Sequence, residues 1–156
     1  MNTMQPEWVE QMAQNLVFDI TKQMADVHLT RVPKIGEIQE QMMMVGVCAL
    51  IGGDNTFSVR LRSEKSLIMR LVRNMTGLEA DDEDVQDYAM EFFNTLCGRF
   101  ISEIINKNRM KARILRIRYE NPLEWKKHEQ EEKFVVLDFV SEENEYISFS
   151  WNDIAF

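Results

Sequence analysis

The stretch Ala89-Met90-Glu91-Phe92-Phe93-Asn94-Thr95-Leu96-Cys97-Gly98 lies at the centre of the segment around which the rest of the chain is expected to fold. Apolar residues recur here at helical spacing, which predicts one long helix from about Asp84 to Asn106. At about 100° per residue, one narrow stripe of this helix is polar and the remainder is apolar. A helix that is apolar over most of its circumference is largely buried, so the polar stripe is the place to look for function. Its members are Asp84, Asp87, Glu91, Asn94, Gly98 and Ser102, with Thr95 at its edge.

Two helices and a hairpin are predicted before this segment. The first helix begins at Pro6, a residue favoured at the first helical position, and a connector follows at Thr30–Gln41. The apolar run Met42–Ile51 predicts a central strand with both faces covered. A Gly-Gly-Asp-Asn turn joins it to an alternating strand at residues 57–62. The second helix, Ser63–Gly77, has Ser63 as its expected cap and Gly77 as its expected end.

Three more strands are predicted after the long helix, at Lys111–Tyr119, Phe134–Val140 and Glu145–Trp151. A polar loop, Asn121–Lys133, separates the first of them from the second. The order is therefore α-β-β-α-α-β-β-β, and no domain boundary is visible. We expect a single α+β domain over residues 1–156, in which a largely antiparallel sheet packs against long helices.

The strand at Lys111–Tyr119 carries a basic patch on an acidic protein. Alternation predicts that Leu115, Ile117 and Tyr119 face one way and that Ile114, Arg116 and Arg118 face the other. The patch is interpreted as a solvated face or edge of the sheet. A surface for an acidic partner is the alternative.

Charge and composition exclude several classes of function. The net charge of −8 argues against a nucleic-acid partner. Cys48 and Cys97 are predicted to be buried thiols in a reducing compartment, and no metal or cofactor site is predicted. The acidic run Asp81–Asp84 lacks EF-hand spacing, so a helix N-terminus explains it better than a metal site. With no leader peptide and no apolar run long enough to span a membrane, we expect a cytoplasmic protein.

The pair Glu91 and Asn94 has a spacing that suits chemistry at a protein surface. Residues three apart on a helix project side by side. An asparagine amide can hold a water in a fixed orientation, and a carboxylate can pair with a lysine of a partner. Gly98, one turn further along, would allow another protein to approach closely. Taken alone, however, the pair is better explained as part of a plain solvated face.

The residues Glu91-Phe92-Phe93-Asn94-Thr95-Leu96-Cys97-Gly98 resemble the ExxNxxxG helix motif of the CheC/CheX/FliY family of chemotaxis phosphatases. The similarity extends to the strand pair with its Gly-Gly turn, the Ser63–Gly77 helix, the acidic linker and the terminal strands. The chain carries one such motif, as the CheX branch does. The resemblance implies a CheC-like fold.

The resemblance also implies an activity: a phosphatase that hydrolyses the aspartyl phosphate of a CheY-type response regulator. Asn94 would orient the attacking water, and Glu91 would bind the regulator's lysine. Asp87, Thr95 and Gly98 would contact the partner, and Mg²⁺ would belong to the regulator rather than to this chain. The resemblance further implies a homodimer. The alternative is a non-catalytic module for binding a signalling protein or for dimerisation.

Overall fold

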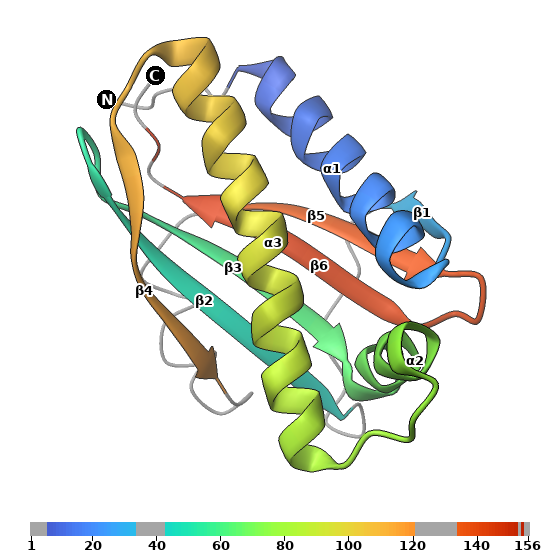
Figure 1. Ribbon diagram of the computed structural model, residues 1–156. Helices are drawn as coiled ribbons and strands as arrows, with labels where there is room; N and C mark the ends of the chain where they lie inside the picture. Colours follow the sequence, from blue (N-terminus) through green and yellow to red (C-terminus); the bar gives the residue numbers. More distant parts are fainter. Residues whose placement is uncertain (1–5, 34–42, 121–133, 153, 155–156) are drawn as a thin grey trace.

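The computed structural model describes residues 6–33, 43–120, 134–152 and 154. The described residues form three helices that lie on one face of a six-stranded sheet (Figure 1). The sheet order is β1-β5-β6-β3-β2-β4, and every neighbouring pair of strands is antiparallel. The predicted α+β class and antiparallel sheet are therefore confirmed. The helices are α1 (Glu7–Ala25), α2 (Lys65–Thr76) and α3 (Asp82–Asn108); the strands are β1 (Leu29–Val32), β2 (Met44–Gly53), β3 (Phe57–Glu64), β4 (Ala112–Glu120), β5 (Phe134–Ser141) and β6 (Tyr146–Asn152).

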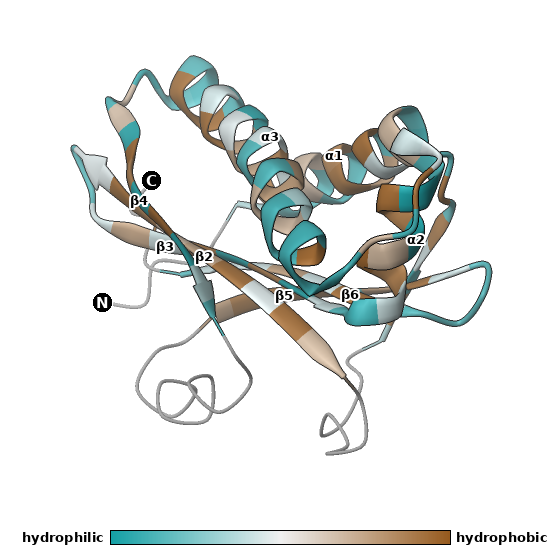
Figure 2. Ribbon diagram, turned by 60° about the horizontal axis from the view of Figure 1, so that its bottom comes forward, coloured by the Kyte–Doolittle hydropathy of each residue, from teal (hydrophilic) through white to brown (hydrophobic). Residues whose placement is uncertain are grey.

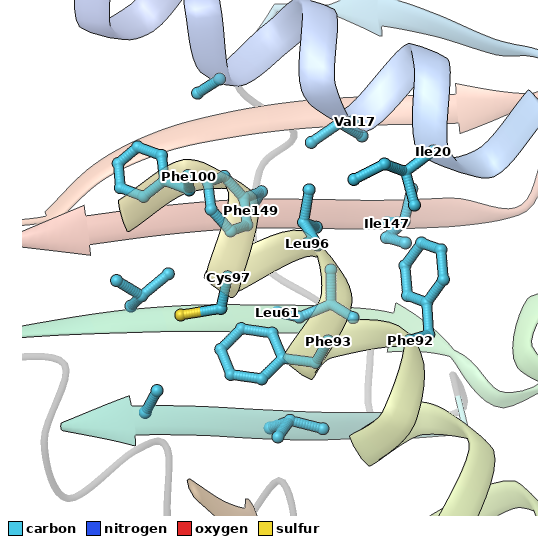
Figure 3. Close-up of a cluster of buried hydrophobic side chains, with 14 of the residues drawn as sticks. Val17, Ile20, Leu61, Phe92, Phe93, Leu96, Cys97, Phe100, Ile147 and Phe149 are labelled. Carbon is cyan, nitrogen blue, oxygen red and sulfur yellow. The ribbon is translucent and has the colours of Figure 1, made fainter. Parts of the chain in front are cut away.

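The core lies between α3 and the middle of the sheet. Figure 3 shows the large side chains of α3 gathered with those of α1, β3 and β6. Phe100 packs edge-on against Phe149 of β6, with 5.2 Å between the ring centroids. The predicted buried face of β6 is confirmed, since Ile147, Phe149 and Trp151 are each 0% exposed. This packing fixes which side of α3 faces the sheet.

The two ends of α3 extend two residues beyond the predicted limits. At the start, the Asp81 carboxylate accepts a hydrogen bond from the Asp84 backbone N–H at 2.8 Å, and the Asp84 carboxylate accepts one from the Asp81 N–H at 3.2 Å. This reciprocal capping box satisfies two of the N–H groups that a helix start leaves without a partner. The acidic run Asp81–Asp84 therefore has a structural role, and its residues start the helix.

One strand was not predicted, and the starts of α1 and α2 also differ from the prediction. Helix α1 begins at Glu7, with Pro6 as its N-cap residue and not as its first helical residue. The connector expected from Thr30 begins with a short strand, β1, which pairs with β5. Ser63 does not cap α2, because it is still part of β3, where it is paired with Val45 on one side and Ile147 on the other. The helix begins at Lys65. The expected end at Gly77 is confirmed, since this residue has φ 75° and stops α2 in the left-handed conformation.

A bulge reverses two predicted orientations in β4. Arg116 pairs with Leu50 and Ile114 pairs with Ile51, so Leu115 has no partner residue on β2. The extra residue turns Ile114 toward the helices with Ile117, whereas Leu115 points outward and is 49% exposed. The alternation expected for Lys111–Tyr119 is therefore wrong at these two positions. The predicted loop Asn121–Lys133 lies outside the described residues.

The helices leave the second face of the sheet uncovered by any helix of the described residues (Figure 2). Along β2, the side chains of Val47, Ala49 and Ile51 point to the helices, and Cys48 and Leu50 point to this second face. No helix within the described residues is long and apolar enough to cross a membrane.

Candidate functional site

The exposed face of α3 carries the Glu91–Asn94 pair. Phe92 and Phe93 are 1% and 0% exposed, and both point from α3 into the core (Figure 3). Because these two residues fix the rotation of the helix, Glu91 and Asn94 must point away from the sheet, and both are exposed. The two side chains lie about one turn apart along the helix, with about 60° between their directions around its axis. One partner surface could therefore contact both.

Both polar groups of the pair are available to a partner. Within the described part of the chain, neither the Glu91 carboxylate nor the Asn94 amide makes a hydrogen bond or an ion pair. An ionised carboxylate only accepts hydrogen bonds, whereas the amide both donates and accepts. The pair can thus hold a cationic group and a water molecule next to each other.

The other predicted members of the stripe surround this pair. Asp87 is exposed one turn before Glu91, and Thr95 is half-buried, with its hydroxyl donating to the Glu91 carbonyl oxygen at 3.2 Å. Gly98 is one turn beyond Asn94, and a Cβ placed on it would meet no atom of the described residues within 4 Å. The structure therefore brings all five predicted residues to one face of one helix, and the space above Gly98 is open.

Asp84, at the start of the stripe, caps the helix and is therefore not counted among the residues offered to a partner. Its carboxylate and backbone N–H form the capping box with Asp81. Arg99 is exposed beside Gly98 and places a positive charge at the edge of the stripe. The surface offered to a partner is therefore Asp87, Glu91, Asn94, Thr95 and Gly98, which we call the α3 stripe.

A shallow cleft at the start of α3 was not predicted from the sequence. It has a volume of about 300 Å³, and Met43, Lys65, Asp82 and Tyr119 are among its lining residues. Lys65 and Asp82 form an ion pair across it, and Met43 is 68% exposed. The sequence carries no local sign of this cleft, because it forms where the ends of β2, β4 and α3 meet.

The two cysteines do not resemble a reactive or metal-binding site. Cys97 is 0% exposed in the core, and burial raises the pKa of its thiol to about 12. Both cysteines are free thiols. Among the described residues, no group of three or more His, Cys, Asp or Glu side chains is arranged to hold a metal ion.

A family model described as "Chemotaxis phosphatase CheX" matches residues 45–139, which include β3, α2, α3 and β4 in full and most of β2 and β5. The matched region contains the whole α3 stripe. A search of curated protein sequences found no match.

Solved structures of CheX and CheC-like proteins have a fold similar to that of this chain. A CheX-CheY-BeF3-Mg²⁺ complex from Borrelia burgdorferi contains a chain with a TM-score of 0.72 and 13% identity, covering 92% of this chain and 96% of that one. Chemotaxis protein CheX from Vibrio vulnificus has a TM-score of 0.69 and 15% identity, with coverage of 92% and 96%. A CheC-like superfamily protein from Shewanella sp. PV-4 has a TM-score of 0.70 and 14% identity, with coverage of 96% and 100%. At these identities the similarity establishes the fold.

Proposed function

Because the chain belongs to the CheX family of chemotaxis phosphatases, we propose that it binds a phosphorylated CheY-type response regulator through the α3 stripe and speeds hydrolysis of its aspartyl phosphate. The observation that carries this proposal is the exposure of Glu91 and Asn94 side by side on α3, with open space above Gly98. The B. burgdorferi neighbour was solved in complex with CheY, which supports a partner of this type.

Asn94 is the proposed catalytic residue. Phosphoryl transfer needs little covalent help from a protein, but it needs a water placed in line with the leaving oxygen. The Asn94 amide is exposed and can donate to one oxygen while accepting from a water. Entering the regulator's site, it would hold that water in the attacking position.

Glu91 is the proposed anchor. Its carboxylate lies one turn before Asn94 and is free to pair with a lysine in the regulator's site. A charge-assisted hydrogen bond there would fix the register of α3 on the partner. Mg²⁺ is expected on the regulator, where it would neutralise phosphate charge, and no residue of this chain is assigned to it.

The test is the decay of acyl phosphate on a CheY-type regulator with Mg²⁺ present. Decay is followed for the regulator alone and with wild type, Asn94→Ala or Asn106→Ala. Asn106 is a matched control, because it is an exposed asparagine of the same helix that lies off the stripe. Wild type and Asn106→Ala should accelerate decay. With Asn94→Ala, the acyl phosphate should decay at the same rate as in the regulator alone. Glu91→Gln should mainly weaken binding, so that a higher concentration of the variant than of wild type is needed for half-maximal acceleration of decay.

The stability of the variants separates a chemical role from a structural one. An exposed polar residue changed to alanine usually alters the free energy of unfolding by less than about 0.5 kcal/mol. If Asn94→Ala accelerates decay as well as wild type does, the assignment of Asn94 is wrong. If wild type binds the regulator without accelerating decay, the chain is an interaction module.

A further inference from the structure

A groove lined by arginine side chains crosses the sheet face opposite the helices. Its floor is Cys48 and Leu50 of β2, and its walls are Ser58 and Arg60 of β3 and Arg116, Arg118 and Glu120 of β4. It has a volume of about 230 Å³. We call it the arginine groove. None of its residues belongs to the α3 stripe.

Strand pairing explains why these residues form a groove. Cys48 pairs with Arg60 on one side and with Arg118 on the other, and Leu50 pairs with Arg116. Directly paired residues lie on the same face of a sheet, and neighbouring strands are about 4.8 Å apart. The long arginines of β3 and β4 therefore rise on both sides of the shorter side chains of β2. Positive charges that far apart can bind one anion between them.

One wall of the groove is rigid. Arg60 is only 7% exposed, and its guanidinium carbon lies 3.7 Å from the centroid of the Phe134 ring. Stacking uses the flat face of the guanidinium, whereas the N–H groups at its rim are the part that recognises oxyanions in general. The side chain thus has little freedom left to lose when a ligand binds.

The opposite wall, on β4, contains two arginines and one glutamate. Arg118 donates two hydrogen bonds to one oxygen of the buried Glu120 carboxylate, at 2.7 and 3.3 Å. Arg116 is exposed and makes no ion pair with any residue of the described part of the chain. Among the described residues that line the groove, three carry a guanidinium group and one carries a carboxylate, so this lining has a positive balance of charge on a protein of net charge −8.

From this arrangement we infer that the arginine groove is a binding site for a small phosphate-bearing solute, separate from the α3 stripe. Guanidinium forks match phosphate oxygens in geometry and charge. The volume is below the roughly 300–1,000 Å³ of sites for drug-sized ligands, which favours a small anion. The net charge of the protein disfavours nucleic acid and other long polyanions.

Binding is tested by calorimetric titration of the full chain with pyrophosphate. Wild type should bind, and Arg116→Gln should weaken binding about tenfold or more, because a hydrogen bond to a charged group is lost. Arg99→Gln is the matched control, since Arg99 is an exposed arginine on α3, away from the groove. Asn94→Ala should bind pyrophosphate as wild type does, so this proposal and the phosphatase proposal can fail independently.

The position of the ligand is tested through Cys48. This thiol lies in the groove floor and is half-buried, whereas Cys97 is fully buried. Burial raises the pKa of the Cys48 thiol, so alkylation by neutral iodoacetamide is run at alkaline pH. Pyrophosphate should slow alkylation of Cys48 in wild type and in Arg99→Gln, and it should do so much less in Arg116→Gln.

Several results would overturn the inference. The inference is wrong if wild type does not bind pyrophosphate, or if Arg116→Gln binds it as tightly as wild type does. It is also wrong if pyrophosphate binds but does not slow alkylation of Cys48. A single-stranded oligonucleotide that binds where pyrophosphate does not would show a polyanion surface instead. Orthophosphate and glucose 6-phosphate are titrated as further arms, and tighter binding of either one supports the site while showing whether inorganic or organic phosphate fits better.

Discussion

At the scale of single residues, Gly98 separates what the fold needs from what a partner needs. A Cβ at this position would meet nothing within 4 Å among the described residues, so the fold itself does not require glycine there. Glycine inside a helix is less favourable than alanine by about 0.5–1 kcal/mol. A residue that weakens the helix and fills no internal gap fits a requirement for close approach from outside.

The predicted result for Gly98→Ala is a gain in stability with a loss of function. The free energy of unfolding should rise by about 0.5–1 kcal/mol, measured by urea denaturation. Acceleration of acyl-phosphate decay and affinity for the regulator should both fall. Ser102→Ala, on the same face one turn further, is the control and should keep its activity. A Gly98→Ala variant that is less stable than wild type would contradict this account.

At the scale of elements, α3 depends on its start as well as on its buried face. The capping box joins Asp81 to Asp84, and α2 ends only a few residues earlier, at Gly77. The cap therefore sets the point at which the chain turns from one helix into the next. Since the stripe residues keep their direction only while α3 holds its rotation, the cap also supports the candidate site.

Asp81→Ala should lower the free energy of unfolding by about 1 kcal/mol, as loss of an N-cap side chain does. For a chain of this size this corresponds to a fall in Tm of about 2–4 °C, measured by calorimetry. Asp87→Ala removes an exposed aspartate of the same helix that caps nothing, and it should change the free energy by less than about 0.5 kcal/mol. Equal effects of the two substitutions would argue against the cap.

At the scale of the whole molecule, one buried arginine joins distant parts of the chain. Arg70 of α2 donates to Glu145 at 2.6 Å and to Glu142 at 2.7 Å, both at the β5–β6 turn. The second oxygen of Glu142 accepts from the backbone N–H of His28, just before β1, at 3.0 Å. The network therefore ties α2, the start of β1 and the β5–β6 turn together.

This network predicts a loss of stability in acid. The hydrogen bond from Arg70, together with backbone N–H groups, lowers the pKa of Glu142 from 4.5 to about 2. The unfolded chain therefore takes up the proton first as pH falls, so the stabilisation is complete above about pH 4.5 and is lost toward pH 2.

The free energy of unfolding of Glu142→Gln should accordingly lie below that of wild type at neutral pH, and the gap should close on acidification. Urea denaturation at a series of pH values measures it. Glu103→Gln, a change of the same kind on α3 and outside the Arg70 network, is the control. A pH-independent gap for Glu142→Gln would mean that its carboxylate contributes no such stabilisation.

Helical periodicity was enough to predict α3 and the direction of its stripe. Phe92 and Phe93 lie on the apolar arc, and an apolar arc must face the core, so the sequence alone indicated that Glu91 and Asn94 point outward. The helix end at Gly77 was also predictable, since it depends on one residue's backbone freedom. The roles of Glu91 and Asn94 stay predictions, because exposure alone does not establish a reaction.

Pairing between strands determined several features that the local sequence pattern could not predict. β1 has four residues and exists because β5 offers it a partner, Ser63 stays in β3 because two neighbouring strands pair with it, and the bulge at Leu115 depends on the register with β2. The arginine groove depends on β3 and β4 both lying beside β2, although two helices separate β3 from β4 in the chain. Periodicity along one segment determines which way a helix faces, whereas the neighbours of a strand are determined by contacts between residues far apart in sequence.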